Sequence, residues 1–134
     1  MNARNLFRVT AALLMLTGLY WLLAPKATVA SYDPNVDPYT VYLVQILGTF
    51  NIALAVLAFS ASRMAPSTER QAVMTTLIVQ QALSLVVNLL AVFGGVIPGG
   101  MGWFVVAFNI VFILAFSYFR FLRPEAEPVP KLQS

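Results

Sequence analysis

Residues 39–61 read YTVYLVQILGTFNIALAVLAFSA, a run of 23 residues without a charged side chain or a proline. A helix of this length rises about 35 Å, which is enough to cross the hydrocarbon core of a bilayer, about 30 Å thick. Three further apolar runs of similar length lie at residues 6–24, 71–93 and 101–122. The sequence therefore predicts an all-α bundle of four transmembrane helices.

The composition of the chain supports a lipid environment. Of its 134 residues, 60% are hydrophobic and 10% are charged, whereas a soluble domain has about 25% charged residues. We expect residues 1–123 to form one transmembrane domain. Residues 124–134 form a Pro-rich, charged tail, which we expect to be disordered on its own.

The distribution of Lys and Arg predicts the orientation of the four helices. Lys26 alone lies in the connections on one side of the predicted spans, whereas the other side carries seven basic residues: Arg4, Arg8, Arg63, Arg70, Arg120, Arg123 and Lys131. Short loops rich in Lys and Arg stay in the cytoplasm. Both termini are therefore predicted to be cytoplasmic.

The first apolar run has a second interpretation. Arg4 and Arg8 form a basic start, and Thr28-Val29-Ala30 after the run has the small residues of a secretory cleavage site. The apolar run is long for a signal peptide, however. An uncleaved first helix is the interpretation we adopt.

Each connection between the spans predicts a turn or a helix start. Residues 25–38 contain two Asp-Pro pairs and predict turns. Thr68, with Gln71 three residues later, predicts a capping box at the start of the third helix. Residues 94–102 hold five of the seven glycines and predict a tight hairpin. The third and fourth helices are thus expected to be antiparallel neighbours.

Two short motifs in these connections do not support ligand binding. Asp33, Asn35 and Asp37 match the start of an EF-hand calcium loop, but Pro38 and Val44 occupy the positions that require Gly and Glu. The glycines after Pro98 lack the Lys-Ser or Lys-Thr pair of a phosphate-binding loop. Both segments are interpreted as turns.

Amide and hydroxyl side chains inside the apolar runs are the candidate functional residues. Gln81, Ser84 and Asn88 are spaced so that they share one helix face. A candidate mid-membrane cluster consists of the polar residues nearest the middle of their spans, Asn51, Gln81, Ser84 and Asn109. Such groups either hydrogen-bond across packed helices or bind the polar head of a quinone, lipid or pigment.

The chemistry missing from the spans argues against several functions. The chain contains no Cys and no His, and no Asp, Glu or Lys lies well inside a span. Proton-coupled transport normally needs an ionisable group there, and catalysis needs an acid, base or nucleophile. We therefore predict no catalytic residue, no metal site and no resident cofactor. The basic pI is explained by the topology and does not indicate nucleic-acid binding.

Three short motifs resemble those of small bacterial four-helix membrane proteins of the DoxX-like type. They are Leu19-Tyr20-Trp21-Leu22-Leu23-Ala24-Pro25, Gln45-Ile46-Leu47-Gly48 and Gly102-Trp103. The resemblance covers residues 6–122. It implies a helix bundle in the bacterial inner (plasma) membrane, and it carries over no catalytic residue.

Together these observations predict a non-catalytic, multi-pass membrane protein. The leading hypothesis is an accessory or structural subunit of a larger membrane complex, or a self-associating scaffold. Its partners would be membrane lipids and other membrane-protein chains or further copies of itself. The alternative is a binding protein for a hydrophobic small molecule. An uncoupled small-solute transporter or an enzyme is a third hypothesis.

Overall fold

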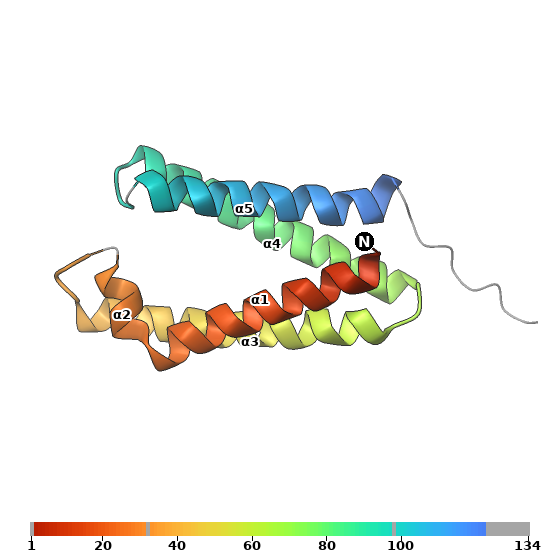
Figure 1. Ribbon diagram of the computed structural model, residues 1–134, viewed down its shortest axis with the longest axis horizontal. Helices are drawn as coiled ribbons and strands as arrows, with labels where there is room; N and C mark the ends of the chain where they lie inside the picture. The colour runs from red at the N-terminus through yellow and green to blue at the C-terminus, as the bar shows by residue number, and fades with distance from the viewer. Residues whose placement is uncertain (1, 32, 98, 123–134) are drawn as a thin grey trace, which may run out of the picture. The chain divides into compact units, whose positions relative to one another are not determined.

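The computed structural model describes residues 2–31, 33–97 and 99–122, which form helices and short connections (Figure 1). In chain order the elements are α1 (Ala3–Leu23), α2 (Pro25–Ala30), α3 (Pro38–Arg63), α4 (Thr68–Phe93), α5 (Gly99–Ser117) and a π-helical turn, η1 (Tyr118–Leu122). The described residues contain no strand. Four segments are long and apolar enough to cross a membrane: Ala3–Leu23, Pro38–Arg63, Thr68–Phe93 and Gly102–Leu122. The predicted all-α fold with four spanning helices is therefore confirmed, while the tail at residues 124–134 lies outside the described residues.

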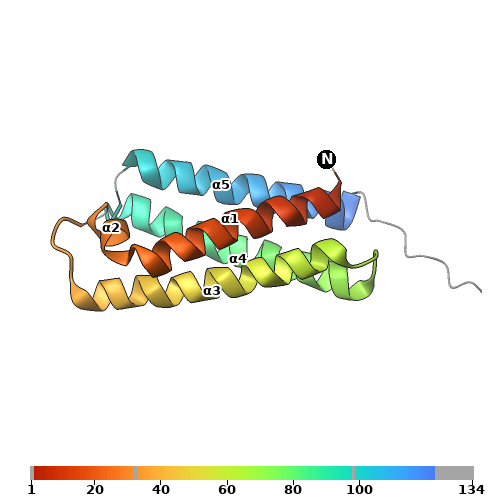
Figure 2. The ribbon, with the colours of Figure 1, turned by 60° about the horizontal axis from the view of Figure 1, so that its bottom comes forward.

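The chain divides into two compact units. Met1–Ser62 is called here the N-terminal hairpin, and Arg63–Ser134 is called the C-terminal hairpin. The N-terminal hairpin contains α1, α2 and nearly all of α3, and the C-terminal hairpin contains α4, α5 and η1. Figures 1 and 2 show that the two long helices within each hairpin run antiparallel.

In the N-terminal hairpin, α1 and α3 meet at two glycines. A Cβ atom added to Gly18 would lie 2.8 Å from the carbonyl oxygen of Gly48 and 3.0 Å from the backbone nitrogen of Ile52. A Cβ added to Gly48 would lie 2.8 Å from the carbonyl oxygen of Gly18 and 3.0 Å from the backbone nitrogen of Leu22. Real Cβ atoms do not approach backbone this closely. The two helices therefore pack main chain against main chain, as small residues permit in membranes.

The connection after α1 is only partly as predicted. Residues 25–30 form the short helix α2, where turns were predicted. Proline at the first position of a helix lacks only an N–H that would have had no helical partner, so Pro25 begins α2 without a lost hydrogen bond. Thr28 and Val29 of α2 are buried, and α2 packs against α1.

The first Asp-Pro pair forms the predicted turn, whereas the second begins helix α3. The backbone N–H of Asn35 donates to Asp33 Oδ1 at 2.8 Å. Asp37 Oδ2 accepts hydrogen bonds from the backbone N–H of Thr40 at 2.9 Å and from its hydroxyl at 3.1 Å. Asp37 thus caps the first turn of α3 and positions the start of that span.

The third span begins earlier than predicted. Ser67 is the capping residue of α4, since its Oγ accepts a hydrogen bond from the backbone N–H of Arg70 at 3.3 Å. Thr68, the predicted cap, is the first helical residue. The apolar run marks the part of a helix that lipid surrounds, whereas the helix itself continues into polar residues. Glu69 in the first turn favours this extension because it lies at the positive end of the helix dipole.

The connection between α4 and α5 is shorter than predicted. Residues 94–98 separate the two helices, and three of the five glycines belong to α5. Gly95 has a φ angle of +67°, in the left-handed region that favours glycine. The rings of Phe93 and Trp103 lie edge to face with centroids 5.9 Å apart. The helices α4 and α5 pack along each other, so the predicted antiparallel neighbours are confirmed.

Candidate functional site

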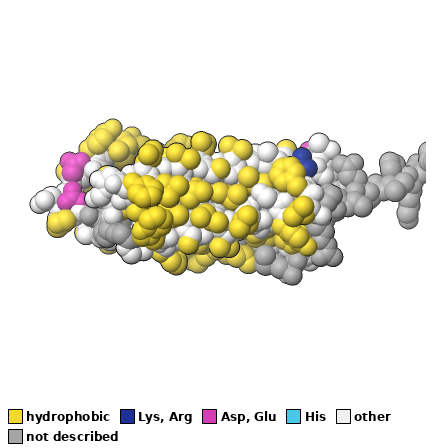
Figure 3. All heavy atoms as spheres, turned by 90° about the horizontal axis from the view of Figure 1, so that it is seen from above, with side chains coloured by type: hydrophobic (Ala, Val, Ile, Leu, Met, Phe, Trp, Pro, Cys, Tyr) yellow, Lys and Arg dark blue, Asp and Glu magenta, His cyan; other side chains and the backbone are white. Residues whose placement is uncertain are grey.

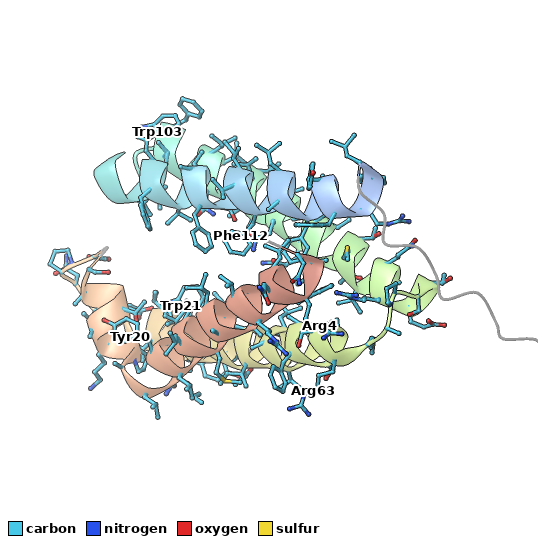
Figure 4. The ribbon with its side chains drawn as sticks, turned by 45° about the vertical axis from the view of Figure 1, so that its right-hand side comes forward. Arg4, Tyr20, Trp21, Arg63, Trp103 and Phe112 are labelled. Carbon is cyan, nitrogen blue, oxygen red and sulfur yellow. The ribbon has the colours of Figure 1, made fainter. Side chains whose placement is uncertain are left out.

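Charged and aromatic side chains separate toward opposite ends of α1. Figure 4 shows Arg4 near the beginning of α1 and both Tyr20 and Trp21 near its other end. The antiparallel helix α3 ends at Arg63, so the arginines gather at one end of this helix pair. Lys26 follows the end of α1, in α2. This asymmetry agrees with the positive-inside pattern.

The C-terminal hairpin shows the same asymmetry. Arg70 lies in the first turn of α4, where its side chain is 2% exposed. Arg120 in η1 belongs to the same end, because its Nε donates a hydrogen bond to Thr75 Oγ1 of α4 at 3.3 Å. The opposite end, at residues 94–98, carries no charged residue. Each hairpin therefore has a single arginine-rich end.

Two of the predicted cluster residues make hydrogen bonds within their own helix. Asn109 is 3% exposed, and its Nδ2 donates to the carbonyl oxygen of Val105 at 2.9 Å. Ser84 Oγ accepts from Gln80 Nε2 at 3.2 Å. Gln80 and Ser84 are four residues apart, a spacing at which helical side chains are neighbours. The prediction placed Ser84 with Gln81 and did not include Gln80 in the cluster.

Gln81 is a buried residue of α4. Its side chain is 6% exposed, and no residue in the described part of the chain hydrogen-bonds to it. Arg70, Met74 and Leu77 precede it on the same buried face of the helix. Ser84 and Asn88 continue this face as half-buried residues, as their spacing predicted.

One acceptor next to Gln81 is also without a donor. Gln80 Oε1 is buried, and the described residues supply it with no hydrogen bond. A buried polar atom without a partner costs free energy, because in water it would be hydrated. A further hydrogen-bonding group beside Gln80 Oε1 would therefore be stabilising.

The four predicted cluster residues are divided between the two hairpins. Gln81, Ser84 and Asn109 belong to the C-terminal hairpin, whereas Asn51 belongs to the N-terminal hairpin and is half-buried there. No described residue hydrogen-bonds to the Asn51 amide. That Asn51 lies with the other three residues stays a prediction.

A row of aromatic side chains lies along α5 next to Asn109, with Phe112 and Phe116 buried and Phe108 exposed. The rings of Phe108 and Phe112 have centroids 4.6 Å apart, and those of Phe112 and Phe116 lie 6.3 Å apart. Figure 4 shows Phe112 on α5. The outer face of α5, which Figure 3 brings forward, is covered with hydrophobic side chains. Phe104, Val111 and Leu114 are more than half exposed on α5, as expected for lipid contact.

The described residues do not form a metal site. Within residues 2–31, 33–97 and 99–122, no three Asp or Glu side chains come together closely enough to hold an ion. Asp33 and Asp37 instead accept the local backbone hydrogen bonds described above.

Comparison with protein families finds one family model that matches the chain. The family model described as a domain of unknown function, DUF8292, matches residues 1–121. The chain belongs to the DUF8292 family. The match includes residues from all four candidate spans of this DUF8292 protein. No curated protein and no solved structure matched the chain. The resemblance to DoxX-like proteins stays a prediction.

Proposed function

We propose that this DUF8292 protein is a non-catalytic accessory or structural subunit of a larger assembly in the bacterial inner membrane, or a scaffold built from its own copies. The observation that carries the proposal is a set of amides inside apolar spans that have no hydrogen-bond partner among the described residues of their own hairpin. Among these amides are the side chains of Asn51, Gln81 and Asn88.

Such amides favour association between proteins. Lipid tails supply no hydrogen bond, so an amide in a span is stabilised by polar groups of other helices. A hydrogen bond of this kind contributes about 0.6–2 kcal/mol. Asn51 and Asn88 are half-buried and therefore accessible to a neighbouring chain.

Replacing the half-buried amides tests this proposal. In Asn51→Leu and Asn88→Leu the amide is lost and an apolar side chain of similar size remains. We expect less of the partner chains, or fewer copies of the protein itself, to be recovered with each variant after extraction in a mild amphiphile. Leu89→Met, on the same helix as Asn88, is the control with no change in polarity. Recovery equal to that of the wild type in both amide variants would contradict the proposal.

The proposed orientation places both termini and the arginine-rich ends in the cytoplasm. Because the chain has no cysteine, single cysteines can report which side each connection faces. Asn35 and Ala65 are both exposed in connections. A maleimide that does not cross membranes should label Asn35→Cys in intact cells and should label Ala65→Cys only after the cells are opened. The reverse pattern would contradict the orientation.

A second candidate function is the binding of a hydrophobic molecule with a polar head. The buried acceptor at Gln80 Oε1 and the adjacent amide of Gln81, a residue only 6% exposed, favour it. Together they fit a molecule that both donates and accepts hydrogen bonds, such as a lipid hydroxyl, a quinol or a pigment. Gln81→Leu should remove such a molecule from the purified protein while helix content stays unchanged. Thr76→Val is the control, since the Thr76 hydroxyl already donates to the carbonyl oxygen of Ala72.

A further inference from the structure

The guanidinium of Arg120 is held in place by two interactions. Its Nε donates to Thr75 Oγ1 at 3.3 Å, and the Thr75 hydroxyl in turn donates to the carbonyl oxygen of Gln71 at 3.0 Å. The central carbon of the guanidinium lies 5.3 Å from the ring centroid of Phe121, within the range of a cation–π interaction. These contacts fix the direction of the arginine at the end of the last span.

The arginines at the start of α1 are held differently. Arg4 and Arg8 are exposed, and the described part of the chain offers neither side chain a hydrogen bond. They contribute positive charge to their end of the hairpin without a defined geometry. Arg120 has the same charge but a geometry that its neighbours impose. This difference indicates a role for Arg120 beyond setting topology.

The atoms of Arg120 that remain available suit a phosphate. Since Nε is used by Thr75, the two terminal nitrogens form a planar fork, and no other described residue accepts a hydrogen bond from them. Such a fork matches the oxygens of a phosphate group and binds it through paired, charge-assisted hydrogen bonds. Holding the side chain in advance reduces the entropy that binding costs.

The surface beside this fork is apolar. Tyr118, Phe121 and Leu122 in η1 are 43%, 64% and 78% exposed. An arginine that extends its charged head beyond exposed apolar side chains lies where headgroups meet acyl chains. The site therefore offers positive charge to a headgroup and hydrocarbon surface to the chains of the same molecule.

We propose that Arg120, held by Thr75 and Phe121, binds the phosphate of an anionic phospholipid whose acyl chains lie against η1. The proposal rests on the membrane location and orientation proposed above, which place this end at the cytoplasmic leaflet, where anionic lipids are concentrated. It does not depend on the protein being a subunit of an assembly.

The test is the titration of the purified full chain with phosphatidylglycerol, followed by native mass spectrometry. Arg120→Gln should raise the dissociation constant of the first bound lipid about tenfold, as expected for the loss of charge-assisted hydrogen bonds. Arg120→Lys keeps the charge but lacks the planar fork, so its dissociation constant should rise about threefold to fivefold. Arg8→Gln, the matched change in charge, should alter it less than twofold.

A second pair of variants tests the positioning of the arginine without changing any charge. Thr75→Val removes the hydroxyl that accepts from Arg120 and should weaken lipid binding about threefold. Thr76→Val removes a hydroxyl that bonds only within its own helix and should leave binding unchanged. Circular dichroism of every variant should match the wild type, so that the effects are assigned to the site.

Three results would overturn the proposal. Equal weakening by Arg120→Gln and Arg8→Gln would show general attraction to the protein's charge. Equal affinity for phosphatidylcholine, which carries no net charge, would exclude an anionic lipid as the preferred ligand. Binding that appears only after Glu125→Gln and Glu127→Gln would assign the guanidinium to the chain's own tail. The same spectra count the protein chains in each particle, so failure of the lipid site and failure of self-association are recorded separately.

Discussion

The two hairpins differ in how their long helices pack against each other. In the N-terminal hairpin, α1 and α3 approach so closely at Gly18 and Gly48 that each glycine would place a Cβ within 3.0 Å of the other helix's backbone. In the C-terminal hairpin, α4 and α5 meet through larger side chains, among them the ring pair Phe93 and Trp103. One contact is made by main chain and the other by side chains.

The comparison shows what a hairpin in lipid tolerates. Lipid tails are as apolar as leucine, so apolar burial alone does little to hold membrane helices together, and close van der Waals packing matters more. A backbone-to-backbone contact cannot adjust to an added atom, because neither helix can move without losing the rest of the interface. Side-chain ends can rotate away. The N-terminal hairpin should therefore be the more sensitive of the two to small substitutions at its glycines.

The largest expected effect is at the glycine contact of the N-terminal hairpin. Gly18→Ala and Gly48→Ala should each lower the free energy of unfolding by about 1–3 kcal/mol, as overpacking does in tight interiors. Thermal unfolding in a mild amphiphile measures the change. Gly100→Ala is the matched control, since nothing lies within 4 Å of the position its Cβ would occupy. Equal stability of Gly18→Ala and Gly100→Ala would contradict the claim that the backbone contact at Gly18 leaves no room for an added atom.

A smaller effect is expected at the glycine of the C-terminal hairpin. A Cβ added to Gly102 would meet Val92 Cγ2 and the end of the Ile97 side chain, and these side chains can give way only by adopting less favourable rotamers. Gly102→Ala should cost about 1 kcal/mol or less in the same unfolding measurement. If Gly102→Ala proves more damaging than Gly18→Ala, the distinction between main-chain and side-chain contact is wrong.

The hydrogen-bonded pair Gln80 and Ser84 on α4 predicts different effects for substitutions of its two members. Ser84→Ala removes the acceptor of Gln80 Nε2 and leaves both polar ends of that amide without partners, so it should cost about 0.5–1 kcal/mol. Gln80→Leu removes the amide altogether, including its unpartnered oxygen, and should be neutral or slightly stabilising. The free energy of unfolding of each variant tests both expectations. If Gln80→Leu is less stable than Ser84→Ala, Gln80 must have a further hydrogen-bond partner.

The smallest effect is a pH dependence outside the spans. The backbone N–H of Thr40, with some help from its hydroxyl, holds the pKa of the Asp37 carboxyl below its ordinary value of 3.8. Because the folded state favours the carboxylate, its contribution is fully present above pH 3.8 and is lost as the pH falls through the lower folded value. As the pH is lowered, the free energy of unfolding should therefore fall slightly more steeply in the wild type than in Asp37→Asn. Identical curves would show that the cap contributes nothing measurable.

The sequence predicted the spans better than the contacts between them. The four long apolar runs were sufficient to predict the four spanning helices, because a spanning length and the absence of charge are properties of each segment alone. The start of α4 was placed too late, because hydropathy marks the lipid-covered part of a helix and the Ser67 cap lies outside it. The glycine contact was not predicted, since helices that are apolar nearly all round do not reveal which face is buried.

The candidate site was predicted in part. The shared face of Gln81, Ser84 and Asn88 follows from helical spacing and is present. The hydrogen bond between Gln80 and Ser84 also agrees with helical spacing. It was not predicted, because both Gln80 and Gln81 lie at a spacing that allows contact with Ser84. The relation of Asn51 to α4 depends on how helices distant in sequence pack, which spacing along one helix does not determine.

The most direct test of the proposed function is the mass and composition of the particle that contains this protein when its native membrane is extracted in a mild amphiphile. We expect a particle larger than one chain, with defined partner chains or a fixed number of copies. In Asn88→Leu this particle should be smaller or less abundant. A protein recovered only as a free monomer, in the wild type and in the variant alike, would contradict the account.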